Sequence, residues 1–183
     1  MPVLTDAQKA IIGVESAPRP AAYPVNQIMA QFWCEMVEDA NPIYFDEAYA
    51  KSTWLEGTFA PPPMILIWRM PPVWPVREER PNPSWDLGLD KMGCTATIAV
   101  NATQEYHHPL RYGDTLTATT QIASIGEEKT TRLGTGHFVT TLDTFRNQRG
   151  EIVGTHSFTL FIYAPGEPRT ENPEPVVEEG SRK

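Results

Sequence analysis

Four segments in the second half of the chain have the alternation and turn spacing of β-strands, and they constrain the fold more than any other feature. Short turn signals separate them, and they span residues 94–106, 116–125, 135–145 and 152–163. In the last segment, every second residue from Phe158 to Ile162 is apolar, which places these residues on one face with Ile152. Strands joined by hairpins at this spacing predict an antiparallel sheet.

A short apolar segment precedes these strands. Three consecutive prolines, residues 61–63, lead into the run 64–70, and proline is tolerated in the first turn of a helix. The run is apolar on all sides, so it is expected to be a buried helix that fills the sheet. Pro71 and Pro72 should limit it to about two turns. The sequence therefore predicts an α+β fold in which a short buried helix packs against the sheet.

A longer helix is expected to begin at Asn26, a residue type that caps helix N-termini. Ile28, Phe32, Met36 and Val37 recur within it at close to helical spacing, and they are predicted to form its core face. Proline disfavours the helical conformation in the residue before it, so the Asn41–Pro42 pair should end this helix. Shorter helices are expected over 4–13, capped by Thr5, and over 46–54, before Gly57.

Length and charge narrow the class of protein. The 183 residues indicate one main domain, 1–164, followed by an acidic, proline-rich stretch, 165–183, expected to be a disordered tail or a linker. With 15 basic and 23 acidic residues, the net charge of −8 argues against nucleic-acid binding. No signal peptide or membrane span is predicted, and Cys34 and Cys94 have no metal or redox spacing. A cytoplasmic protein without a bound metal is expected.

The proline-rich segment 73–90 is interpreted as a functional loop or lid.

The segment 38–64 resembles the overhang of the MaoC-like, or hydratase-2, dehydratases, whose pattern is Gly-Asp-x-Asn-Pro-(Leu/Ile)-His. Asp39, Asn41, Pro42 and Ile43 match it, whereas Glu38 replaces the glycine and Tyr44 replaces the histidine. The resemblance extends to the turn 106–116 and to the strands and turn of 141–158, so it covers residues 26–163. The stretch 57–64 is similar to the N-terminal domain of fatty-acid-synthase-type dehydratases. This resemblance implies the hot-dog fold, an antiparallel sheet wrapped around a central helix.

In the resembled family, the aspartate and histidine of the overhang hold the water that adds to an enoyl thioester. A tyrosine at position 44 is a poor base, because an unperturbed phenol has a pKa near 10. Degenerate halves of this family pair with a second hot-dog chain that carries both residues. The resemblance therefore implies a non-catalytic, substrate-binding subunit of a heteromeric (R)-specific enoyl-CoA hydratase or dehydratase. Coenzyme A would be part of the substrate, and no cofactor is implied.

Carried over onto this chain, the substrate-binding residues would be Asp39, Asn41, Tyr44, Pro62, Met64, Trp68 and Arg111. The shortened helix leaves space for a bulky acyl group, such as a steroid side-chain intermediate. The aromatic residues near this space, Trp68, Trp74 and Trp85, would suit a flat apolar ligand. The packing of a proline-rich loop explains these tryptophans equally well. Asp39 is equally well explained as an Asx-turn residue, and a solvated Arg111 is the commoner outcome for such a residue. Arg69 is a second arginine that could meet the phosphates of coenzyme A.

Other interpretations remain open at this stage. His107 and His108 read as a surface pair, and neither they nor His137 and His156 can be placed beside Asp39 from the sequence. A self-sufficient hot-dog thioesterase or dehydratase is one alternative, although the run 64–70 lacks the carboxylate that thioesterases of this fold use. A non-enzymatic acyl-CoA-binding module is the other.

Overall fold

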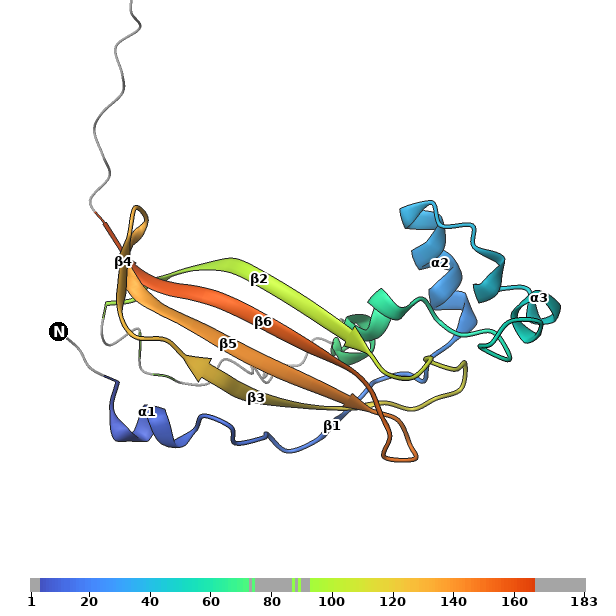
Figure 1. Cartoon of the computed structure of the whole chain (residues 1–183), viewed down its shortest axis with the longest axis horizontal. Coiled ribbons are helices and arrows are strands. Elements are labelled where there is room, and N and C mark those ends of the chain that lie inside the picture. The colour runs from blue at the N-terminus through green and yellow to red at the C-terminus, as the bar shows by residue number, and fades with distance from the viewer. Residues whose placement is uncertain (1–3, 73, 75–86, 88, 90–92, 167–183) are drawn as a thin grey trace, which may run out of the picture.

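The computed structural model of the chain describes residues 4–72, 74, 87, 89 and 93–166 (Figure 1). The helical elements are α1 (Asp6–Ala10), α2 (Gln27–Val37), η1 (Pro42–Tyr44), α3 (Glu47–Lys51) and η2 (Pro62–Arg69), of which η1 and η2 are 3-10 helices. The strands are β1 (Arg19–Pro20), β2 (Ala96–Tyr106), β3 (Thr117–Ile125), β4 (Lys129–Thr131), β5 (Gly134–Arg146) and β6 (Ile152–Pro165).

The strands form one antiparallel sheet in the order β1-β3-β5-β6-β2, with β4 paired to β5. All four strands expected from the sequence are present, within two residues of the expected bounds. Two short strands were not expected: β1 lies in a proline-rich stretch and pairs Arg19 with Ala118, and β4 extends the hairpin before Gly134. The prediction of an antiparallel α+β fold is confirmed.

The short helix η2 lies against the sheet and forms the centre of the core. Its residues Met64, Ile65 and Trp68 are buried and pack in one cluster with apolar side chains of the sheet, among them Leu116, Ala118 and Phe145. The contact is close, because a Cβ built on Gly154 of β6 would lie 2.8 Å from Cδ1 of Ile65. This is the hot-dog arrangement that the resemblance implied.

The prediction that η2 is short is also confirmed. It ends at Arg69, and Met70 has the extended backbone expected of a residue before a proline. The last turn is attached to the sheet by a buried polar network, in which the carboxylate of Asp143 accepts bonds from Arg69 and from the hydroxyl of Thr120, 2.5 Å away. Nδ1 of His156 lies 3.4 Å from the same carboxylate.

Local capping determines where the first helices begin. Thr5 caps α1 in a capping box with Gln8, Asn26 caps α2, and Asp46 caps α3. The predicted end of α2 at Asn41–Pro42 is wrong: the helix stops at Val37, because Glu38 adopts a left-handed conformation with φ of 58°.

The predicted core face of α2 is also wrong. Ile28, Phe32 and Met36 are 68%, 66% and 72% exposed, and Val37 is exposed as well. The helix instead buries Ala30 and Cys34, with Met29 and Trp33 partly buried against the core. The side of the helix that carries Ala30 and Cys34 faces the core, so Ile28, Phe32 and Met36, on another side, are left exposed.

Most of the segment 73–90, including Trp85, and the stretch 167–183 lie outside the described residues, so the expectations of a functional loop and a tail stay predictions. Of the helices in the described part of the chain, none has the length and hydrophobicity needed to span a membrane.

Candidate functional site

The overhang between α2 and η2 is built from two consecutive turns. One carboxylate oxygen of Asp39 accepts the backbone N–H of Asn41 at 3.1 Å, and the side-chain oxygen of Asn41 accepts the N–H of Ile43 at 3.2 Å. The second turn starts η1, with Pro42 in its first position. Both residues of the motif therefore shape the backbone, and Asp39 keeps its other carboxylate oxygen for further contacts.

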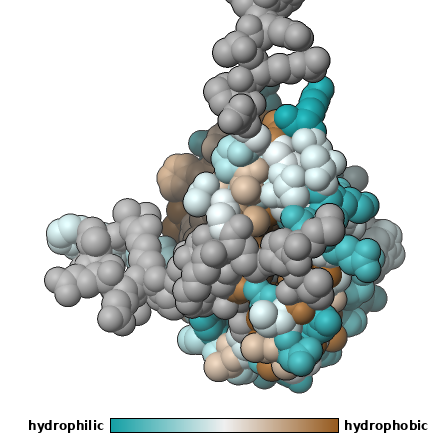
Figure 2. Space-filling view, turned by 90° about the vertical axis from the view of Figure 1, so that its left-hand side faces the viewer, coloured by the Kyte–Doolittle hydropathy of each residue, from teal (hydrophilic) through white to brown (hydrophobic). Residues whose placement is uncertain are grey.

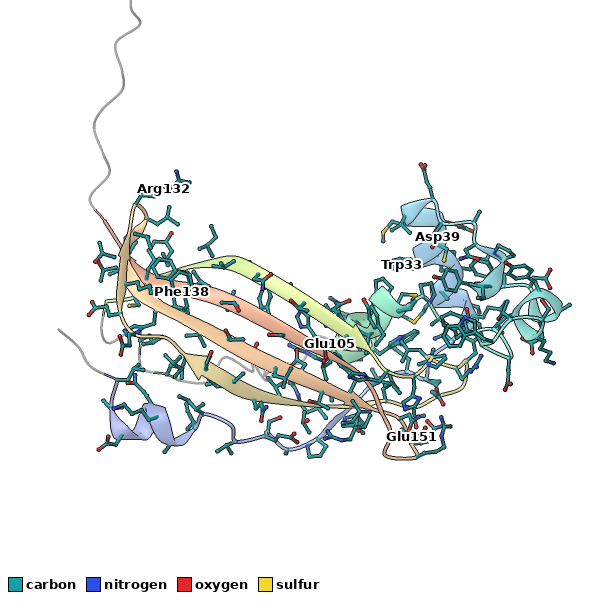
Figure 3. All side chains as sticks on the ribbon, viewed as in Figure 1. Trp33, Asp39, Glu105, Arg132, Phe138 and Glu151 are labelled. Carbon is teal, nitrogen blue, oxygen red and sulfur yellow. The ribbon has the colours of Figure 1, made fainter. Side chains whose placement is uncertain are left out.

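Asp39 lies on the wall of an open groove of about 630 Å³ beside the C-terminal end of α2 (Figure 3). The groove is lined by Gln27, Gln31, Cys34, Glu35, Glu38, Asp39, Ala40 and Phe45. Three of these side chains are acidic and none is basic. The groove therefore favours apolar, amide or cationic groups and disfavours the phosphates of coenzyme A.

Tyr44 packs beside this groove without lining it. Its ring meets that of Phe59 edge to face, with 5.4 Å between the centroids, and its backbone carbonyl accepts the hydroxyl of Tyr112 at 2.9 Å. Burial, and secondly the nearby Asp39 carboxylate, raise the pKa of the Tyr44 phenol above its usual value near 10. The phenol is therefore neutral at pH 7 and cannot act as the base that the family histidine provides.

Arg111 anchors the overhang to the turn before β3. Its Nη1 donates to the carbonyls of Gly57, at 2.6 Å, and Thr58, at 3.2 Å, and its Nη2 donates to the carbonyl of Leu55. The guanidinium proposed from the sequence as a phosphate ligand is thus directed at three backbone carbonyls.

Comparison with known proteins assigns the family. The model of the FAS1-like dehydratase domain region matches residues 10–156. The chain belongs to this family.

Two curated relatives of this FAS1-like dehydratase domain are hydratase subunits. The probable enoyl-CoA hydratase alpha subunit of Thermomonospora curvata is 35% identical over 87% of this chain and 54% of its own length. The 3-oxo-4,17-pregnadiene-20-carboxyl-CoA hydratase alpha subunit of Mycobacterium tuberculosis is 34% identical over 74% of this chain and 45% of its own length. The chain thus spans about half the length of both relatives.

A solved structure with a similar fold comes from one of the same organisms. One chain of the ChsH1-ChsH2 complex from Mycobacterium tuberculosis superposes with a TM-score of 0.77 at 29% identity, covering 93% of this chain and 97% of that chain.

The FAS1-like dehydratase fold separates the residues proposed from the sequence into two groups. Asp39, Asn41 and Tyr44 lie together in the overhang, and Arg111 holds it. Met64 and Trp68 are buried between η2 and the sheet, with Pro62 half-buried at the start of the helix. Trp68 is the more unusual, because its Nε1 is buried with no hydrogen-bond partner among the described residues.

None of the four histidines lines the groove around Asp39. His107 and His108 are exposed, as expected for a surface pair. His137 is buried with Nδ1 2.9 Å from the carbonyl of Gly126, and His156 belongs to the network around Asp143. A replacement for the lost overhang histidine is therefore not found at this groove.

Sequence reasoning missed two contributors to the site. Cys34 lines the groove from α2, and burial followed by the charge of Asp39 raises the pKa of its thiol. Tyr112 fastens η1 through its hydroxyl, and burial as the largest cause raises its pKa to about 12. The position of Tyr112 next to Arg111 in the 106–116 turn was the available signal, because both residues contact the overhang.

Proposed function

We propose that this chain is the non-catalytic, substrate-binding half of a heteromeric enoyl-CoA hydratase of (R)-specificity. The observation that carries the proposal is an intact overhang in which a neutral, packed Tyr44 occupies the histidine position. Hydration requires one group to take a proton from water and another to protonate the α-carbon. Asp39 alone cannot supply both, and in the resembled family both groups come from one overhang, so we expect the second half to bring an aspartate and a histidine.

The free edge of β2 supports the need for a second subunit. This strand has 11 residues, nearly all exposed, and contains neither lysine nor proline. It pairs with β6 on one side, and its other edge carries no strand among the described residues. Natural proteins usually shorten, charge or cover such an edge, because it offers unpaired backbone groups to another chain. A second hot-dog subunit adding its own strand here would complete one double sheet.

A bulky acyl group is the substrate that best fits the shortened η2. The helix stops at Arg69, and Trp74, which follows it shortly in the chain, is 80% exposed. An exposed indole offers a flat apolar surface to a ring system. The relative named for a steroid carboxyl-CoA has the same kind of domain, which supports a ring-bearing enoyl-CoA over a short linear one. Because the groove at Asp39 is acidic and Arg111 is occupied, we expect the partner to bind the coenzyme A phosphates.

Hydration assays test the proposal directly. Enoyl-CoA hydration is measured with this chain alone, with a hot-dog subunit from the same source that carries the overhang aspartate and histidine, and with the two together. Activity is expected in the mixture only, lost on mutating the aspartate or histidine of the partner and retained in Asp39→Asn of this chain. Hydration by this chain alone, or loss of activity in Asp39→Asn with the complex intact, would refute the non-catalytic role.

The thioesterase alternative gains no support from the core. Among the described residues, the carboxylate that contacts η2 is that of Asp143, and it is occupied by Arg69 and Thr120. Hydrolysis of an acyl-CoA by the isolated chain would revive this alternative. Binding of acyl-CoA with no turnover in any mixture would favour the non-enzymatic module instead.

A further inference from the structure

The outward face of α2 carries a stripe of large apolar side chains, formed by Ile28, Phe32 and Met36. The three are spaced four residues apart, so they lie in a row along the helix, and each is about two-thirds exposed or more. A helix on the surface of a monomer normally presents polar residues on its outer face. A contiguous apolar row of this size is typical of a surface that another molecule covers.

The helix that carries the stripe lies on the side of the molecule on which the free edge of β2 lies. In Figure 1, β2 forms the upper edge of the sheet, and α2 rises above the end to which β2 points, whereas α1 and β1 lie along the lower edge. A chain that adds a strand to β2 would therefore lie in the space that α2 borders.

We propose that the Ile28–Phe32–Met36 stripe is the contact of α2 with the second hot-dog subunit, continuous with the strand pairing at β2. This inference rests on the proposed function. Pairing along one strand covers mainly backbone edges, whereas a stable interface buries on the order of 1,000 Å² or more. The stripe would extend the apolar surface of this edge, because β2 itself exposes Ile98 and Val100 among mostly small and polar residues.

Charge restricts the surface that fits the stripe. α2 has no basic residue, and Glu35, Glu38 and Asp39 lie at its C-terminal end. The partner should therefore present an apolar strip with Lys or Arg at the rim that faces this end. The same charges disfavour a membrane, because anionic lipid surfaces attract basic helices.

The downstream part of a longer protein is a less suitable occupant. β6 ends at Pro165 beside β4, at the end of the sheet opposite α2 (Figure 1). Figure 2 views that opposite end, where the coloured residues facing the viewer mix hydrophilic and apolar types. The turn between β4 and β5, marked by Arg132 in Figure 3, lies there and offers a matched control in the exposed Leu133.

The test compares Phe32→Lys/Met36→Lys with Leu133→Lys. Each is titrated against the purified hot-dog subunit that confers hydration activity on the mixture, after circular dichroism has confirmed the fold. The double variant should bind at least about a hundredfold more weakly, because two large apolar contacts are lost, and Leu133→Lys should bind within about twofold of wild type. A photo-cross-linking phenylalanine derivative at position 32 should capture that subunit, and one at position 133 should not.

Each other outcome overturns the inference. If the double variant binds normally and the mixture hydrates enoyl-CoA, the stripe is not the contact, and the proposed function stands. If position 32 cross-links a second copy of this chain instead, the stripe joins copies of the same subunit. If the wild-type chain neither binds nor activates the hot-dog subunit, the proposed function fails, and this inference fails with it.

Discussion

The polar network under the end of η2 allows a quantitative test of how the shortened helix is held. The side chain of Asp143 is 2% exposed, whereas that of its partner Arg69 is 28% exposed. Two single substitutions, Arg69→Met and Asp143→Ala, each remove one side of the pair. A double substitution, Arg69→Met/Asp143→Leu, replaces both groups with apolar side chains.

The difference in exposure predicts which single variant is worse. Arg69→Met leaves the Asp143 carboxylate buried without its charged partner, which costs about 3 to 5 kcal/mol of unfolding free energy. In Asp143→Ala the guanidinium of Arg69 can turn into solvent, so the loss should be smaller, about 2 to 3 kcal/mol, mainly from the lost bonds of Thr120 and Arg69. The 3.4 Å contact of His156 is too long to add much.

Urea unfolding followed by circular dichroism, at pH 7 and one fixed protein concentration, measures these values. The double variant should recover most of the stability lost in Arg69→Met, because a buried ion pair is often replaceable by apolar groups of similar volume. The ion pair would be refuted as the attachment of η2 if each single variant lost less than about 1 kcal/mol of unfolding free energy. It would also be refuted if the loss in the double variant equalled the sum of the two single losses.

Three further predictions concern the overhang. Arg111→Ala should lower the unfolding free energy by about 2 to 4 kcal/mol, because three carbonyls lose a charged donor. Hydrogen exchange should increase around Leu55. Arg111→Lys should retain only part of the stability that Arg111→Ala loses. Tyr44→Phe should leave the hydration rate of the complex within about twofold of wild type, because the phenol is neutral and its anchoring bond is made by the backbone carbonyl; a loss above tenfold would assign the hydroxyl a chemical role. Hydrogen bonds from Lys51 and then Thr58 lower the pKa of Glu47 to about 2, so its contribution to stability is complete above about pH 4.5 and disappears as the pH falls toward 2. Glu47→Gln should therefore be less stable than wild type at pH 7 and equally stable near pH 2, and a difference that persists at pH 2 would contradict this.

Local interactions were predictable from the sequence. Thr5, Asn26 and Asp46 cap their helices because each side chain reaches a backbone N–H only three residues away. The four long strands follow from alternation and turn residues, and the end of η2 follows from the geometry imposed by Pro71. The overhang motif could be located for the same reason, since the turns of Asp39 and Asn41 are closed within the motif itself.

What depends on distant neighbours was decided only by the tertiary structure. Helical spacing shows that Ile28, Phe32 and Met36 share a face, but the side on which the core lies determines whether that face is buried. Arg111 binds carbonyls more than fifty residues away in the sequence, and Arg69 reaches Asp143 across the core, so neither role has a local signature. Local sequence patterns were enough to predict the family, the sheet and the replacement of the overhang histidine by Tyr44. The tertiary structure decided which charged groups are occupied and which apolar face is left uncovered, because burial and charge pairing are properties of residues brought together by folding.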